Sequence, residues 1–176
     1  EKDKEFIEKL KSLGGKVVQI DYEPFNESAN LLYSGPWVTE RYIAIKDTIT
    51  KTPQVVEPTV RKIISGGDKI DAVNYFQSEY TLKKNRKYVN KIFEEFDFML
   101  TPTTGTIYKI DEVNSDPIQL NPNLGYYTNY MNLLDLSAIA LPAGFRKNGL
   151  PFGVTIVANT FEEEKLLSYS SLYLKD

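Results

Sequence analysis

The chain has 176 residues, of which 41% are hydrophobic and 26% are charged, a balance that suits a single globular unit with a sizeable core. Its formal net charge is −3, and Lys and Arg are scattered rather than massed, which argues against nucleic acid or an anionic membrane surface as the main partner. No apolar run approaches the roughly 20 residues of a membrane-spanning helix, so a membrane partner is not expected.

The beginning of the chain alternates between predicted helix and strand. Apolar residues recur at helical spacing over residues 3–13, and two glycines end that stripe. Residues 16–20 predict a short strand, and residues 21–32 predict a second, shorter helix. A helix followed by Gly-Gly and an apolar strand is typical of α/β proteins.

Two longer helices are expected in the middle of the chain. Pro36 suits the first turn of a helix that runs from Trp37 to about Thr50. The expected core-facing stripe of this helix consists of Val38, Tyr42, Ile45 and Ile49. Apolar residues recur again over residues 71–96, which predicts a helix about 39 Å long.

The stretch that follows predicts one strand, one loop and one helix. Residues 96–100 form a short apolar run before Pro102 and indicate a buried strand. Residues 108–122 show no clear period and are rich in Asp, Asn and Pro, so we expect a loop there. Residues 124–134 are expected to be helical.

The end of the chain predicts a hairpin and a final helix. Residues 138–141 indicate a buried strand, and the Asn148-Gly149 pair is a strong hairpin signal. Residues 152–158 should therefore pair antiparallel with the preceding strand. Thr160 and Glu163 have the spacing of a capping box for the last helix. The apolar face of that helix is expected to contain Phe161, Leu166, Leu167 and Tyr173.

Several catalytic and metal sites are excluded by composition or spacing. The sequence has no Cys and no His, which rules out a Cys nucleophile, a Cys–His zinc site, a Ser–His–Asp triad and disulfides within this chain. Residues 65–68 (Ser-Gly-Gly-Asp) lack the Gly-Lys-Ser/Thr ending of a phosphate loop and predict an ordinary turn. Asp111, Glu112 and Asp116 do not follow a calcium-loop spacing, so no metal site is expected.

The sharpest local motif is residues 32–42, Leu-Tyr-Ser-Gly-Pro-Trp-Val-Thr-Glu-Arg-Tyr. Arg41 lies four residues after Trp37, so the two share a helix face on which the indole can stack on the guanidinium. A guanidinium held in this way suits a planar carboxylate, because its fork can donate two parallel hydrogen bonds. The ring of Tyr33 could approach the same space from the preceding segment.

A purely structural role for these two side chains remains open on the residues alone. Arg41 could pair with Glu40, Asp47 or another surface acid, and Tyr33 could simply pack.

A second set of candidates surrounds the expected strands. Residues 100–105 end a predicted buried strand, and ligands gather at the carboxyl ends of strands in open α/β sheets. Gly125 and Asn129 could offer a backbone group and an amide to a small polar substrate. Asn side chains also cap or bridge segments, so that role stays open for Asn129.

Several segments resemble the amidase signature family. The resemblance is carried by residues 96–103 (Phe-Asp-Phe-Met-Leu-Thr-Pro-Thr), 128–129 (Thr-Asn), 141–144 (Leu-Pro-Ala-Gly) and 149–154 (Gly-Leu-Pro-Phe-Gly-Val). Residues 33–42 and 132–136 are similar to the allophanate-hydrolysing branch of that family. In that branch the matching Tyr and Arg contact the substrate, so the resemblance implies that Tyr33 and Arg41 bind it.

The resemblance also implies a fold and a reaction. The fold is α/β, with a mixed sheet flanked by helices, and residues 1–176 correspond to the C-terminal portion of a single amidase domain. The reaction is amide hydrolysis without a metal or cofactor. The family's Ser nucleophile, second Ser and Lys base belong to an earlier Gly/Ser-rich portion, which has no counterpart here, so this chain is expected to supply no catalytic residue. The chain also begins at Glu1, inside a predicted helix and without an initiator Met, so we expect it to be a piece of a longer protein.

The function implied is hydrolysis of allophanate to ammonia and carbonate species in urea degradation. The expected partners are the missing N-terminal half of the domain and a urea carboxylase, fused or separate, which owns the biotin and ATP of the pathway. A cytoplasmic location fits the missing Cys, and a homodimer is possible. The alternatives are an amidase signature enzyme with another amide substrate, or a binding module that kept the scaffold and lost the chemistry.

Overall fold

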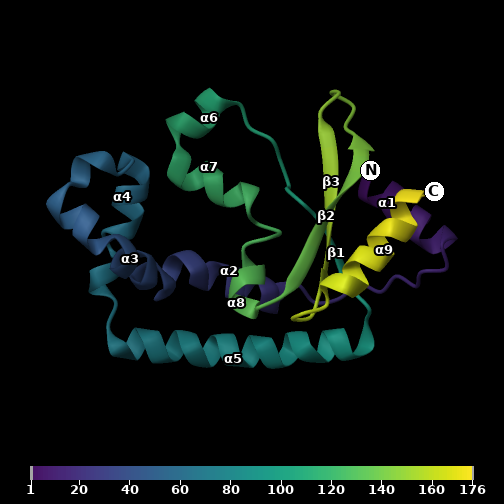
Figure 1. The fold of residues 1–176 in the computed structure, drawn as a ribbon, viewed down its shortest axis with the longest axis horizontal. Coiled ribbons are helices and arrows are strands. Elements are labelled where there is room, and N and C mark those ends of the chain that lie inside the picture. The colour runs from purple at the N-terminus through teal and green to yellow at the C-terminus, as the bar shows by residue number, and fades with distance from the viewer. Residues whose placement is uncertain (1, 176) are drawn as a thin grey trace.

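The computed structural model describes residues 2–175, which form a small sheet and a set of helices, several of which lie away from the sheet (Figure 1). The α-helices are α1 (Lys2–Ser12), α2 (Glu23–Ser34), α3 (Trp37–Lys51), α4 (Pro58–Ile64), α5 (Ala72–Glu95), α6 (Ile110–Ser115), α7 (Pro117–Leu124), α8 (Tyr130–Leu134) and α9 (Glu163–Lys175). The strands are β1 (Met99–Pro102), β2 (Ser137–Phe145) and β3 (Pro151–Ala158), and two short 3-10 helices are η1 (Pro53–Val55) and η2 (Gly67–Lys69).

The three strands form one sheet in the order β1-β3-β2, with antiparallel pairing throughout the described part. Ile156 of β3 lies opposite Leu100 on one side and Ile139 on the other. The predicted hairpin is confirmed, and Gly149 supplies the left-handed backbone of its turn at φ +80°. The strand expected at residues 96–100 begins at Met99, because Phe96 still caps the C-terminus of α5.

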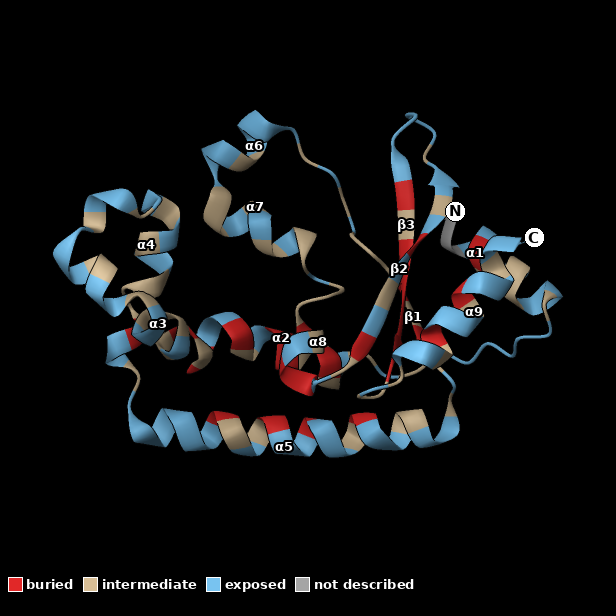
Figure 2. Cartoon of the chain, viewed as in Figure 1, coloured by how far each residue is buried: buried red, intermediate tan, exposed pale blue. Residues whose placement is uncertain are grey.

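Helices cover both faces of this sheet, as expected, and each face has its own core. Successive residues of a strand point to opposite faces. Val157 accordingly joins a core between the sheet and α2, α5 and α8, whereas Ile156 joins a second core with Phe6 of α1 and Leu166 of α9. The buried residues of α5 lie along the edge of the helix that faces α2 and α8 (Figure 2). The long helix expected at residues 71–96 is confirmed, and the Asp71 side chain caps it by accepting from the Asn74 N–H at 2.8 Å.

The strand predicted at residues 16–20 is wrong. This segment has no regular secondary structure and no strand partner among the described residues, and Val17 and Val18 are 48% and 58% exposed. An apolar run becomes a strand only where a neighbouring strand takes up its backbone groups.

The loop predicted at residues 108–122 is also wrong, because it contains α6 and much of α7. Asp116 caps α7 by accepting from the Gln119 N–H at 3.3 Å, and Pro117 occupies the first turn. The helix expected at residues 124–134 is reduced to α8, since residues 125–129 form a turn.

The start of the last helix is built differently from the predicted capping box. The Thr160 hydroxyl donates to the Asp135 carbonyl, and the Glu163 carboxylate accepts from the Ser137 hydroxyl at 2.7 Å. Both groups therefore tie the start of α9 to Asp135 and to the first residue of β2 rather than to each other. Phe161 lies outside the helix at φ +63° and is 90% exposed, so its predicted core role is wrong.

The stripe predicted for α3 is only partly buried. Val38 is buried, whereas Tyr42, Ile45 and Ile49 are half-buried. The helix is also interrupted at Ile45, whose backbone has φ −122° and ψ 15°. The first two turns of α3 are thereby separated from the rest of the helix.

Candidate functional site

The Arg41 guanidinium lies over the Tyr33 ring in the structure. The Arg41 Cζ is 5.5 Å from the centroid of the Tyr33 ring, within the range of a cation–π contact. Tyr33 is 40% exposed, and Arg41 is half-buried. The pair therefore presents an aromatic face and a positive charge side by side at the surface.

The short break between α2 and α3 brings the two residues together. The Gly35 N–H donates to the Leu31 carbonyl at 2.9 Å and closes the last turn of α2. Pro36 then begins α3 with helical φ, as its fixed ring geometry favours. With only two residues between the helices, Tyr33 in the last turn of α2 meets Arg41 in the second turn of α3.

The Arg41 guanidinium has no acidic partner within residues 2–175, where no ion pair or hydrogen bond engages it. Asp47, one of the acids considered from sequence, pairs with Lys51 at 2.8 Å. The expected stacking of Arg41 on Trp37 is wrong, because the ring partner is Tyr33 and Trp37 packs against the core formed with α2, α5 and α8. Arg41 thus lies over the Tyr33 ring while no hydrogen bond or ion pair from residues 2–175 engages its N–H donors.

Gly125 and Asn129 are also neighbours, at the two ends of a single tight turn. The Gly125 carbonyl accepts from the N–H groups of Thr128 and Asn129 at 2.9 and 2.8 Å, so that oxygen is already occupied. A side chain at Gly125 would overlap the Asn129 amide, which shows how closely the amide lies over the glycine. Asn129 begins α8 without capping it through its side chain. The Asn129 amide, rather than the Gly125 carbonyl, is therefore the group that could meet a ligand.

A cluster of tyrosines that sequence reasoning missed anchors this turn. The Tyr22 hydroxyl donates to the Tyr126 carbonyl at 3.1 Å, and the Tyr22 ring lies edge-on to Tyr130 with centroids 5.9 Å apart. Burial raises the pKa of Tyr22 and of Tyr130 well above the usual range, so both stay protonated at neutral pH. The residues come from segments more than 100 positions apart, so no local pattern could have revealed the cluster.

The structure does not join the two candidate pairs into one contact. Tyr22, which holds the turn at residues 125–129, precedes α2, whereas Tyr33 lies in the last turn of that helix. Eleven helical residues rise about 16 Å. Tyr33 with Arg41, and Gly125 with Asn129, therefore lie toward opposite ends of α2.

The loop after β1 is held by a second arginine that the sequence did not single out. The Arg146 guanidinium lies 5.3 Å from the centroid of the Phe152 ring and donates to the Thr104 carbonyl at 3.4 Å. The hydroxyls of Thr103 and Thr155 are 2.9 Å apart and tie the same loop to β3. Residues 100–105 thus end a buried strand, as predicted, and are fixed by side chains from the hairpin.

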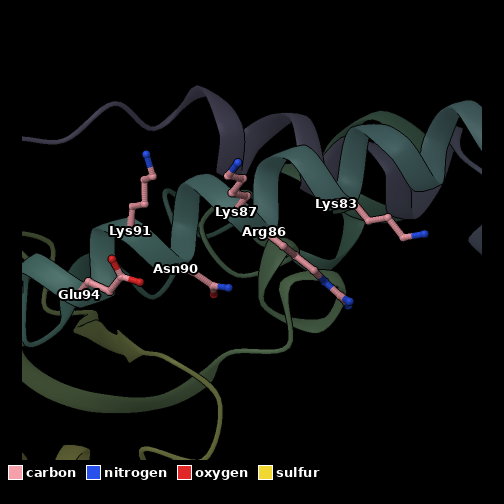
Figure 3. A pocket seen from close by; sticks show the side chains of 6 residues that line it. All are labelled: Lys83, Arg86, Lys87, Asn90, Lys91 and Glu94. Carbon is pink, nitrogen blue, oxygen red and sulfur yellow. The ribbon is translucent and has the colours of Figure 1, made fainter.

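A depression of about 410 Å³ lies elsewhere, along α5 (Figure 3). It is lined by Lys83, Arg86, Lys87, Asn90, Lys91 and Glu94, and none of these is a predicted site residue. Lys87 and Lys91 point away from Asn90 and Arg86 rather than toward a common centre (Figure 3). The Arg86 guanidinium is moreover engaged, with Nε and Nη2 donating to the Leu133 carbonyl at 3.0 and 2.7 Å. Tyr33 and Arg41 are therefore the better candidates for binding a small ligand, because the Arg41 donors are not engaged within residues 2–175 and those of Arg86 are.

Two further kinds of feature are missing from residues 2–175. No helix there combines the length and the apolar character needed to cross a membrane. No group of three or more acidic side chains is arranged there to hold a metal ion.

Comparison with known proteins identifies the class. The Amidase family matches residues 1–167, and the chain therefore belongs to this family. It is 37% identical over 172 residues to the urea amidolyase of Saccharomyces cerevisiae and 39% identical over 171 residues to that of Lachancea kluyveri, covering 97% and 96% of this chain. The solved allophanate hydrolase of Kluyveromyces lactis has a TM-score of 0.90 and 37% identity, over 95% of this chain and 28% of that one. The chain spans only 9% of the length of the two urea amidolyases.

Proposed function

We propose that the chain is the substrate-holding, C-terminal portion of an amidase domain that hydrolyses allophanate. The observation that carries the proposal is the Arg41 guanidinium, which is stacked on Tyr33 and has no acidic partner among the described residues. Allophanate is a small planar ureido group that ends in a carboxylate. Its charged end matches the guanidinium fork, and its plane matches the Tyr33 ring. The similarity to urea amidolyases and to an allophanate hydrolase supports the same assignment.

The bond-breaking groups belong, in this proposal, to the other half of the domain. An amide is cleaved by a nucleophile that has a base in hydrogen-bond reach and an oxyanion pocket. This chain has no counterpart of the Gly/Ser-rich portion that carries the Ser nucleophile, the second Ser and the Lys base in the family. A Ser outside residues 1–176 attacks the terminal amide carbonyl, the carbon–nitrogen bond breaks and ammonia leaves, and a water molecule then hydrolyses the acyl–Ser ester to free the Ser. Arg41 and Tyr33 hold the carboxylate end meanwhile, and Asn129 beside Gly125 is proposed to contact the substrate less directly. The hydrolysis itself uses no cofactor.

The proposal places the protein in urea degradation in the cytoplasm. Allophanate is then the product of a urea carboxylase, fused to the amidase domain or separate, which uses biotin and ATP. The relatives support the fused arrangement, because the matched region is a small part of a much longer chain. A homodimer of the complete protein stays a prediction.

Replacing Arg41 by Leu in the complete protein tests the proposal. We expect kcat/KM for allophanate to fall by at least roughly 30-fold, the equivalent of about 2 kcal/mol for a lost charge pair. Ammonia release from biuret, the neutral carboxamide of the same shape, should change little. Lys46→Leu removes an exposed cation from the same helix and serves as the matched control.

The other outcomes point to the alternatives. If Arg41→Leu leaves allophanate turnover unchanged, the result supports an amidase with another amide substrate. A complete protein that folds cooperatively and releases no ammonia from either amide supports a non-catalytic binding module.

A further inference from the structure

The start of η2, at Gly67, lies tightly against the beginning of α3. A Cβ at Gly67 would come within 2.7 Å of both the Tyr42 Cβ and the Val38 carbonyl oxygen. The Thr39 hydroxyl donates to the Gly67 carbonyl at 2.7 Å. A side chain does not fit at Gly67, whereas a Cβ at the adjacent Gly66 would meet only the Ile63 carbonyl oxygen at 3.9 Å. The turn predicted at residues 65–68 therefore also packs specifically against α3. The contact of Gly67 with Val38, Thr39 and Tyr42 is called the seat of α3 below.

This seat fixes the rotation of α3 about its own axis. At about 100° per residue, Val38, Thr39 and Tyr42 share one face, and Trp37 points about 145° away from the centre of that face. Trp37 packs against the core, so the first turns of α3 are held from two directions. Arg41 projects between these directions, about 40° from Trp37. Its direction therefore depends on both contacts.

The interruption at Ile45 makes the seat more important. A continuous helix would transmit the packing of its C-terminal half to its beginning. The backbone of Ile45, at φ −122° and ψ 15°, breaks this continuity one turn after Arg41. The packing of residues beyond Ile45 thus gives little support to the residues that carry the guanidinium.

We propose that Gly67 and Thr39 are positioning residues that aim the Arg41 guanidinium at the substrate carboxylate. The inference rests on the proposed function and extends it to two residues that do not touch the substrate. The physical reason is that recognition by a fork depends on its angle as well as its charge. A misplacement of about 1 Å caused from outside the site can cost up to about 100-fold in rate.

Steady-state kinetics of the complete protein with allophanate tests this proposal. Gly67→Ala should raise KM at least about tenfold and lower kcat less, whereas Gly66→Ala should leave both within about twofold. Thr39→Val should raise KM roughly three- to tenfold, and Thr39→Ser, which keeps the hydroxyl, should restore it. Thr39→Val also keeps the test valid if Gly67→Ala fails to fold. Trp37 is the only Trp in the chain, so its emission, in a variant of the complete protein whose other Trp residues are replaced by Phe, reports whether the start of α3 is intact.

A double-mutant cycle separates this proposal from the proposed function. In an Arg41→Leu background, Thr39→Val should have no further effect on KM, because there is no guanidinium left to aim. An undiminished effect of Thr39→Val in that background overturns the positioning role but leaves Arg41 as the carboxylate reader. Unchanged KM in folded Thr39→Val and Gly67→Ala proteins overturns it as well. If Arg41→Leu alone leaves the allophanate KM unchanged, the proposed function is wrong. The positioning role is then wrong as well, because it depends on Arg41 binding the carboxylate.

Discussion

Replacing the buried Asn85 by Ala should weaken the attachment of α2 to α5. Asn85 is 1% exposed, and its Nδ2 donates to the Glu27 carboxylate at 3.0 Å and to the Ser28 hydroxyl at 3.1 Å. A hydrogen bond to a charged acceptor is worth about 1.5–3 kcal/mol and a neutral one about 0.5–1.5 kcal/mol. Glu27 is only half-buried, so water recovers part of the first bond. We expect a local cost of about 2–3 kcal/mol.

Hydrogen exchange of the α2 amides measures this cost, because it reports local opening even in a large protein. A loss of 2–3 kcal/mol corresponds to a fall in protection of about 30- to 150-fold. Asn90→Ala is the matched control, since Asn90 is exposed on the same helix and should change protection little. Equal protection of α2 in the Asn85→Ala and Asn90→Ala proteins would refute the reasoning. Since α2 carries Tyr33, a confirmed loss would also predict weaker allophanate binding.

Two further substitutions probe the turn before α8 and the start of α9. Gly125→Ala should cost less than about 1 kcal/mol, because the side chain of Asn129 can rotate away, but it should shift the Asn129 amide resonances in NMR spectra, whereas Gly105→Ala should not. The hydrogen bond from Ser137 lowers the pKa of Glu163, so the stabilisation is present above the ordinary value of 4.5 and is lost as the pH falls through the lowered pKa. Ser137→Ala should therefore raise the pKa of Glu163 toward 4.5 in an NMR titration, and an unchanged pKa would contradict this account.

Elements with a strong local signal were predictable. The helix from Ala72 to Glu95 combines an Asp N-cap with apolar residues at helical spacing, and the β2–β3 hairpin combines Asn148-Gly149 with two apolar runs. The N-cap marks where the helix begins, and the hairpin turn also states which two strands pair. The amidase assignment, made from short segments, agrees with the family match over residues 1–167.

The elements that the sequence did not predict depend on partners distant in sequence or lie in segments with the composition of a loop. Residues 16–20 have strand-like composition, but the described residues offer no strand beside them. The Asp116-Pro117 pair is a helix start, but the surrounding Asp, Asn and Pro residues have the composition of a loop and no helical period. Thr160 and Glu163 had the spacing of a capping box but bind Asp135 and Ser137 instead, a choice that only the folded chain determines.

The candidate site was likewise predictable only in the parts that carry a local sequence signal. Pro36 predicted a helix that begins at Trp37, and the four-residue spacing between Trp37 and Arg41 predicted that Arg41 would lie on this helix beside an aromatic side chain. It did not predict which ring, because Trp37 is drawn into the core and Tyr33 is left at the surface. The contribution of Gly67 was not visible in the sequence at all, since the turn lies 26 residues after Arg41 and reaches α3 only in the fold (67 − 41 = 26).

The most direct test of the central claim is a crystal structure of the complete protein with malonamate, in which a methylene replaces the nitrogen between the two carbonyl groups of allophanate. The account predicts that the malonamate carboxylate accepts two hydrogen bonds from Arg41, at about 2.7–2.9 Å, beside the ring of Tyr33. A carboxylate bound away from Arg41, with the guanidinium still resting on Tyr33 and facing solvent, would contradict it.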